Sequence, residues 1–116
     1  MTIRQVGLDE VFTGAEFVLQ AVVKRPLEYF ERGFGVRFAD DADDLDSYKV
    51  AGLRFDDRVP LALIQYSNHP EDEVTLYMTH DPDRFEEAAR LLPALLEALR
   101  LPPEAITWTR EPSPAL

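Results

Sequence analysis

The first apolar pattern along the chain has the spacing of a helix. Its members recur at intervals of three and four residues: Ala15, Val18, Leu19, Val22 and Val23. Thr13 and Glu16 stand where a capping box places its two reciprocal backbone bonds. Pro26 has no N–H to donate to the carbonyl four residues earlier, so it kinks the helix or starts a second one. The sequence therefore predicts a broken helix from about 13 to 32.

The period changes to two after this segment. Phe34, Val36 and Phe38 alternate with other residues, which predicts a short half-buried strand. Three longer strand-like runs follow at 48–55, 59–66 and 73–79. Residues 61–64 are apolar at every position, which is typical of a central strand covered on both faces. In the last run Val74, Leu76 and Met78 are expected to share one face.

Helical spacing returns in the last third of the chain. Asp81 and Pro82 are a preferred cap and a preferred first residue of a helix. An apolar stripe runs from there to Leu99, with a kink predicted at Pro93. Residues 105–110 predict a final short strand, with Ile106 and Trp108 on one face. The last six residues, 111–116, are expected to form a frayed tail.

The order of these elements is α-β-β-β-β-α-β. Short connections predict an antiparallel meander of four to five strands, with two kinked helices packed mainly on one face. The last strand follows a helical crossover, which allows it to run parallel to a neighbour. The sequence thus predicts a single α+β domain over residues 1–110.

One layer of helices covers only one face of such a sheet. Ala51, Leu61, Leu63 and Tyr77 are expected to need cover on the other face. Curvature of the sheet, or a segment folded over it, is one solution. The alternative is a second copy of the chain or a partner protein, giving a homo-oligomer or a complex. Tyr66 and Tyr77 fall on neighbouring strands and are expected to share this face.

Composition narrows the functional classes. The 116 residues carry 22 acidic and 12 basic side chains, a net charge of −10. This charge argues against nucleic acid or an anionic membrane as a partner. A basic stretch at 24–37 is interleaved with Glu28 and Glu31, which weakens it as an exception. The chain has no cysteine, which excludes disulfides, zinc–thiolate sites and thiol nucleophiles.

The compartment is inferred from targeting signals. Residues 1–10 contain no basic cluster followed by an apolar run, which a secretory signal needs. The longest nearly uncharged apolar stretch, 59–66, is far shorter than the ~20 residues that span a bilayer. A cytoplasmic location is therefore expected.

The negative charge is concentrated in the strand region. Residues 40–73 hold ten acidic and three basic residues, and so seven of the ten net charges. An exposed loop is predicted for its most acidic part, with carboxylates at Asp40, Asp41, Asp43, Asp44 and Asp46. An EF-hand is excluded because Leu45 and Ala51 stand where that loop needs Gly and Glu. A solvated turn, a docking surface for a basic partner and an unfamiliar cation site remain as alternatives.

The two histidines do not suggest a shared metal. His69 and His80 flank the predicted strand at 73–79, and about 20 Å separates them. Ser67–Asp72, which contains His69 and Glu71, could form a polar pocket. The chain has neither a Gly-x-Ser-x-Gly elbow nor a glycine loop before a helix. No catalytic residue, metal or cofactor is predicted.

The sequence favours a non-enzymatic protein-binding domain with an adaptor, chaperone-like or immunity-like role. Its partner is expected to be a protein, and a basic one would suit the acidic surface. The candidate binding residues are Asp40, Asp41, Asp43, Asp44, Asp46, Tyr66, His69, Glu71 and Tyr77. The alternative is a small ligand- or metal-binding module, or an enzyme, with a pocket near Ser67–Asp72.

Overall fold

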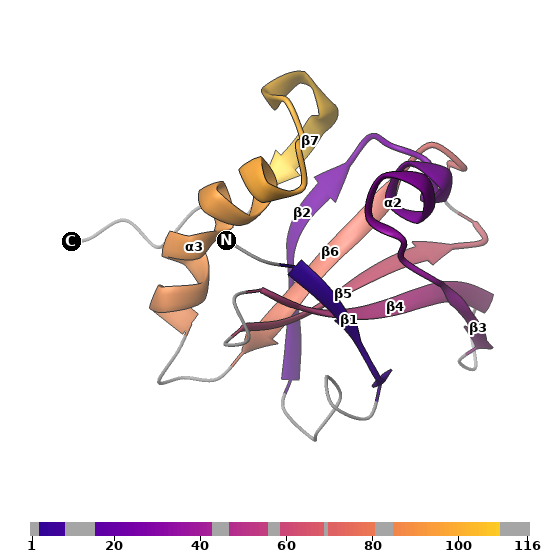
Figure 1. Cartoon of the computed structure of the whole chain (residues 1–116), viewed down its shortest axis with the longest axis horizontal. Coiled ribbons are helices and arrows are strands. Elements are labelled where there is room, and N and C mark those ends of the chain that lie inside the picture. Colours follow the sequence, from indigo (N-terminus) through magenta and orange to yellow (C-terminus); the bar gives the residue numbers. More distant parts are fainter. Residues whose placement is uncertain are drawn as a thin grey trace.

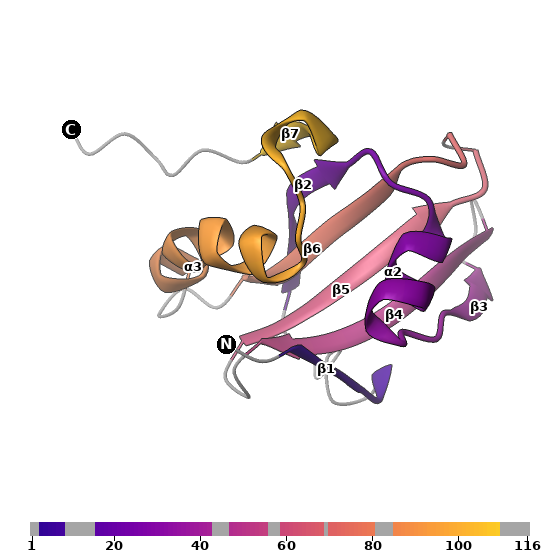
Figure 2. The same ribbon diagram turned by 45° about the horizontal axis from the view of Figure 1, so that its top comes forward.

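The computed structural model describes residues 3–8, 16–42, 47–55, 59–68, 70–80 and 85–109. In this part of the chain a mainly antiparallel sheet of seven strands is combined with two helices, which is an α+β fold. Figures 1 and 2 show both helices on the same face of the sheet. We call this the helix face and the opposite one the second face.

The strands and helices follow each other along the chain as listed here: β1 (Ile3–Val6), β2 (Glu16–Val23), α2 (Leu27–Phe34), β3 (Ala39–Ala42), β4 (Ser47–Phe55), β5 (Val59–Tyr66), β6 (Val74–His80), α3 (Phe85–Ala98), the short 3-10 helix η1 (Pro103–Ala105) and β7 (Ile106–Thr109). The order in the sheet is β1-β4-β5-β6-β2-β7, and every pair is antiparallel. β1 and β3 share the outer edge of β4, where β1 pairs with 52–55 and β3 with 47–50.

The main core lies between the sheet and the two helices. Two rows of directly opposed residues cross its centre: Ala51, Leu63 and Leu76, then Leu53, Leu61 and Met78. All six are buried. α2 contributes Leu27 and Phe30, and α3 contributes Leu92 and Leu95. Truncating such a side chain to alanine typically costs about 2–5 kcal/mol.

The second face has a smaller apolar cluster of its own. Val50, Ala62 and Ile64 are 1%, 0% and 8% exposed. Tyrosines from β4, β5 and β6 pack against this cluster, together with Leu8. The expectation that Ala51, Leu61 and Leu63 need cover here is wrong, because the register turns all three towards the helices. The second-face aliphatic residues are shielded within a single chain, which removes the observation that suggested a second copy.

The predicted broken helix over 13–32 is wrong in its first half. Residues 16–23 form β2, which lies between β6 and β7. A β-bulge between Leu19 and Ala21 interrupts the alternation of the strand, and both Ala21 and Val23 are fully buried. Such a strand mimics helical spacing, because the bulge shifts the period. The proposed cap at Thr13 lies outside the described residues.

The second half of that helix is confirmed as α2, directly after Pro26. It ends at Gly35, whose left-handed φ of 66° favours glycine. The strand predicted at 34–38 is wrong, since Phe34 belongs to α2 and the next strand begins at Ala39. Val36 is buried and Phe38 packs against the same core. The alternation therefore arises from burial of every second residue in a segment that is not paired as a strand.

The strands predicted in the middle of the chain correspond to β4, β5 and β6, and the last helix to α3, which contains Pro93. Its predicted start at Asp81 lies outside the described residues, as does the tail. The last strand, β7, runs parallel to β6, as a helical crossover allows, but β2 lies between them and is antiparallel to both. Thr107 is an extra residue in β7, so Ile106 and Trp108 pair with the successive residues Val23 and Val22 and do not share a face.

Candidate functional site

Two acidic segments that are distant in sequence lie at the same end of the sheet. The start of β4 lies beside the end of β5, where the Ser67 N–H donates to the Ser47 carbonyl over 3.0 Å. The end of β3 and the start of β4 therefore lie at the same end of the sheet as the end of β5 and the start of β6, at the right of Figure 1. This arrangement brings Asp40 and Asp41 to the end of the sheet that also carries Glu71.

The carboxylates at this end point into solvent. Asp40, Asp41, Glu71 and Asp72 are all exposed. Lys49 forms an ion pair with one of them, with 3.8 Å between its Nζ and Asp40 Oδ1. Because these side chains are 54% and 88% exposed, this ion pair contributes at most about 1 kcal/mol. The excess of negative charge at this end remains.

The prediction of a loop is wrong for Asp40 and Asp41, which belong to the edge strand β3. Asp40 pairs with Lys49 and Asp41 with Tyr48. The side chains of an edge strand can remain charged because they project into solvent. Charged edge strands discourage pairing with a strand of another chain. Asp43, Asp44 and Asp46 lie outside the described residues.

Three tyrosines line the second face next to these acids. Tyr48 and Tyr66 are directly opposed, and their ring centroids are 5.6 Å apart at a tilt of 57°. The hydroxyl oxygens of Tyr66 and Tyr77 are 3.4 Å apart, which is long for a hydrogen bond. All three are half-buried, so each ring packs on the apolar cluster and also meets water. Asp41 is opposite Tyr48 and shares this face, whereas Asp40 is opposite Lys49 and projects towards the helix face. We call Tyr48, Tyr66 and Tyr77, with the carboxylates Asp40, Asp41 and Glu71 at the same end of the sheet, the acidic tyrosine end.

Side chains of β5 and β6 donate hydrogen bonds to backbone carbonyls in and beside the turn that joins these strands. Gln65 Nε2 donates to the Glu71 carbonyl over 2.7 Å, and the Thr75 hydroxyl donates to the Ile64 carbonyl over 2.7 Å. The Glu71 carboxylate remains exposed to solvent. His69, the other candidate in this turn, lies outside the described residues. No observation here favours a catalytic or metal-binding pocket over a turn.

The opposite end of the second face carries two arginines that sequence reasoning missed. Arg4 on β1 is directly opposite Arg54 on β4. Tyr48 and Arg54 are six positions apart on β4, which is about 20 Å along a strand. β1 was not predicted at all, because only Val6 of its four residues is buried. We call Arg4 and Arg54 the arginine end.

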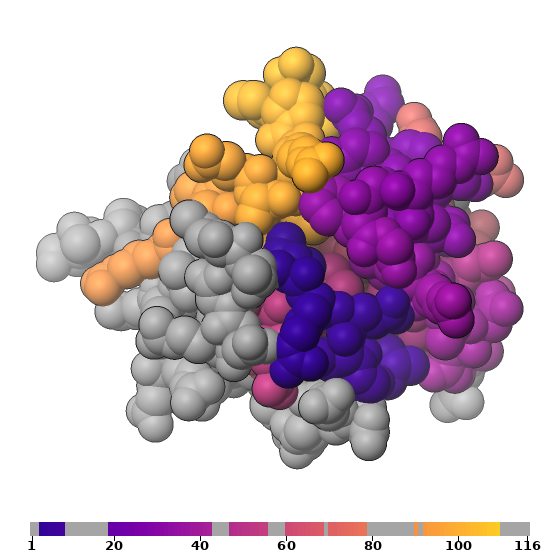
Figure 3. Space-filling view, viewed as in Figure 1, coloured from indigo at the N-terminus to yellow at the C-terminus, as the bar shows by residue number. Residues whose placement is uncertain are grey.

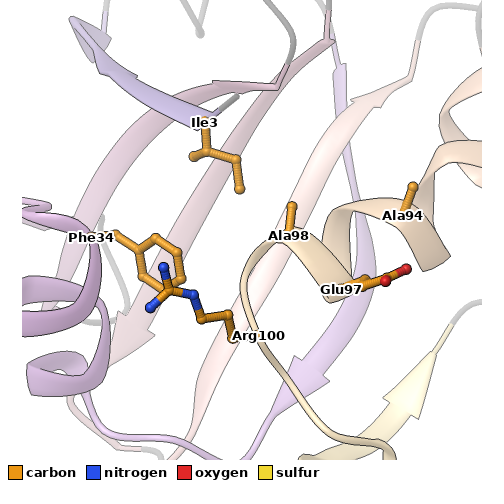
Figure 4. Close-up of a pocket in the computed structure, with 6 residues that line it drawn as sticks. All are labelled: Ile3, Phe34, Ala94, Glu97, Ala98 and Arg100. Carbon is orange, nitrogen blue, oxygen red and sulfur yellow. The ribbon is translucent and has the colours of Figure 1, made fainter. Parts of the chain in front are cut away.

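On the helix face, α2, α3 and β1 meet (Figure 3). A pocket of about 410 Å³ between them is lined by Ile3, Phe34, Ala94, Glu97, Ala98 and Arg100 (Figure 4). The Arg100 guanidinium carbon lies 5.5 Å from the centroid of the Phe34 ring. These side chains offer no nucleophile and no set of metal ligands.

The end of α3 forms one side of this pocket. Arg100 adopts a left-handed φ of 56°, its N–H donates to the Glu97 carbonyl, and the Leu101 N–H donates to the Leu96 carbonyl. These bonds form a Schellman motif, in which glycine is the usual left-handed residue. The Tyr29 hydroxyl lies 2.7 Å from the carbonyls of both Leu99 and Arg100. The pocket therefore lies beside hydrogen bonds that connect α2 to the end of α3, which gives it a structural explanation.

In the described ranges, no three histidine or acidic side chains are grouped as a metal site would require. Nor does any helix of these ranges have the length and apolarity to cross a membrane. Comparisons with models of protein families, with curated proteins and with solved structures found no match.

Proposed function

We propose that this chain is a non-enzymatic protein-binding domain, and that its acidic tyrosine end binds a basic segment of a partner protein. One observation carries the proposal. The pairing of β3, β4 and β5 sets Asp41 opposite Tyr48 and Tyr48 opposite Tyr66, whose hydroxyl lies 3.4 Å from that of Tyr77. Tyrosine is enriched at protein interfaces, because it combines a large apolar ring with a polar hydroxyl.

The chemistry of this surface suits lysine and arginine side chains. A cation over a tyrosine ring gains about 0.5–1 kcal/mol at an exposed site. Neighbouring carboxylates such as Asp40 and Asp41 add attraction that also speeds association. Salt screens such exposed charges, so affinity is expected to fall as ionic strength rises. The half-buried rings are already packed on the apolar cluster, and less side-chain freedom is lost on binding.

Titration calorimetry with an oligolysine peptide tests the proposal, using two variants of equal charge. The test variant is Asp40→Asn with Asp41→Asn and Glu71→Gln. The control is Glu28→Gln with Glu31→Gln and Glu104→Gln, all exposed and located on α2 and η1. Each variant removes three negative charges. We expect the dissociation constant to rise about tenfold in the test variant, because several charge contacts are lost.

The control variant should weaken the binding of oligolysine no more than about twofold, through the net charge alone. An equal loss in the two variants would show that the peptide is attracted by overall charge and that the acidic tyrosine end is no binding site.

A further inference from the structure

We propose that the pocket between β1, α2 and α3 binds a small molecule with an apolar body and a single carboxylate group. Its volume of about 410 Å³ lies in the range of small-molecule sites, which are mostly apolar and have a few polar groups that fix the ligand. The lining has this composition. Four side chains are apolar and two carry opposite charges: Ile3, Phe34, Ala94 and Ala98, with Glu97 and Arg100.

The apolar part of the pocket is formed by three elements. Ile3 projects from β1 and Ala98 from α3 into the same space, and Phe34 at the end of α2 borders it (Figure 4). All three side chains are half-buried. Their exposed atoms would be removed from water by an apolar ligand, which favours binding.

The guanidinium group of Arg100 is held over this space and is available to an anion. Its carbon lies 5.5 Å from the centroid of the Phe34 ring, and in the described part of the chain it forms no ion pair. Because the ring already positions the side chain, less freedom is lost when the guanidinium binds. The hydrogen bond from Tyr29 uses the backbone carbonyl of Arg100 and leaves the side chain free for a ligand.

The backbone of Arg100 is a second, independent observation. Its φ of 56° lies in the left-handed region, which is unfavourable for a residue with a Cβ atom. Glycine is the usual residue at this place of a Schellman motif. Residues held in such conformations cluster at ligand sites, where the side chain has a task. An arginine at a position that favours glycine is explained if its guanidinium binds a ligand.

The choice of a single carboxylate follows from the charges at the pocket. One guanidinium fork pairs with both oxygens of a carboxylate, and the two unit charges balance. The Glu97 carboxylate points away from Arg100 and does not occupy the fork (Figure 4). Its negative charge disfavours a ligand group with two negative charges, such as a phosphate dianion. The ligand class is therefore a monocarboxylate whose apolar part contacts Ile3 and Ala98.

The test uses octanoate as the probe. Octylamine has an apolar chain of the same length and the opposite charge, and acetate is a carboxylate without an apolar body. Each is added to the full chain at constant ionic strength, while NMR spectra follow the methyl signals of Ile3, Ala94 and Ala98. We expect saturable shifts with octanoate, and a dissociation constant at least about tenfold lower than for octylamine or acetate. The net charge of −10 favours octylamine, so tighter binding of octanoate would come from the pocket itself.

Arg100→Gln should raise the dissociation constant for octanoate at least about tenfold, because a charge-assisted contact is lost. Arg25→Gln is the matched control. The Arg25 guanidinium carbon lies 5.8 Å from the centroid of the Tyr29 ring, and neither residue lines the pocket, so affinity should not change. Arg100→Gly suits the left-handed backbone and should show the same loss even if Arg100→Gln fails to fold.

Three results would overturn the proposal. The first is the absence of saturable methyl shifts when octanoate is added to the wild-type chain. The second is binding of octylamine or acetate as tight as that of octanoate. The third is an affinity for octanoate that is unchanged in Arg100→Gly, or that falls equally in Arg25→Gln.

Discussion

The two ends of the second sheet face carry opposite charges, although the same strand runs through both. At the start of β4, Tyr48 lies beside the acidic edge strand β3. At its end, Arg54 lies opposite Arg4 of β1. Between them the aliphatic cluster around Val50 and Ala62 is buried. The difference arises because β3 pairs with the first half of β4 and β1 pairs with the second half. One face therefore has two chemically distinct ends.

The largest expected effect tests whether the centre of this face is shielded as the helix face is. Leu63 and Ile64 are neighbours on β5 that point to opposite faces, and both are buried. Leu63→Ala should lower the free energy of unfolding by about 3–4 kcal/mol, and Ile64→Ala by about 2–3 kcal/mol. Urea denaturation measures both. A loss below about 1 kcal/mol for Ile64→Ala would mean that the second face is open to water in solution.

A second prediction concerns a buried polar side chain without a partner on β2. Gln20, at the bulge of β2, is fully buried, and neither of its amide atoms has a hydrogen-bond partner. If the amide has no partner in solution either, Gln20→Met should stabilise the protein by about 1 kcal/mol. Methionine has a similar volume and removes the unsatisfied amide. Thermal and urea unfolding measure the change. Destabilisation would show that the amide has a partner in solution.

A third prediction separates the rings of the acidic tyrosine end from its charges. Tyr66→Leu keeps an apolar side chain over the cluster and removes the aromatic face. The dissociation constant for oligolysine should rise about threefold, which corresponds to the loss of one exposed cation–π contact. An unchanged affinity for oligolysine would assign recognition to the carboxylates alone.

The smallest effect concerns the arginine end. Arg54→Gln should raise the free energy of unfolding by about 0.5 kcal/mol, because it relieves the repulsion from Arg4 on the neighbouring strand. Urea unfolding measures the change. A clear loss of stability on removing Arg54 would contradict a destabilising pair of like charges.

The parts of the fold that were predicted from sequence are those with a local signature. The alternation of Val74, Leu76 and Met78 is confirmed in β6, where all three are buried on the helix face. β2 was predicted as a helix because its bulge and its burial on both faces disturb the period of two. β1 gives almost no signal, since its pairing with β4 depends on residues about fifty positions away.

The candidate site shows the same limit. Acidic residues and tyrosines were identified from composition and spacing, and the structure places Tyr66 and Tyr77 side by side on the second face. The position of Asp41 opposite Tyr48 requires the pairing of β3 with β4, which no local pattern encodes. Arg4 and Arg54 are unremarkable in sequence, and only the register of two distant strands brings them together.

The most direct test of the acidic tyrosine end is one NMR experiment in which oligolysine is added to a uniformly labelled chain. We expect oligolysine to shift the backbone signals of Asp40, Asp41, Tyr48, Tyr66 and Glu71, and to leave those of Arg4 and Arg54 at the opposite end of the second face unchanged. Shifts that are spread evenly over all exposed acidic residues would contradict the account.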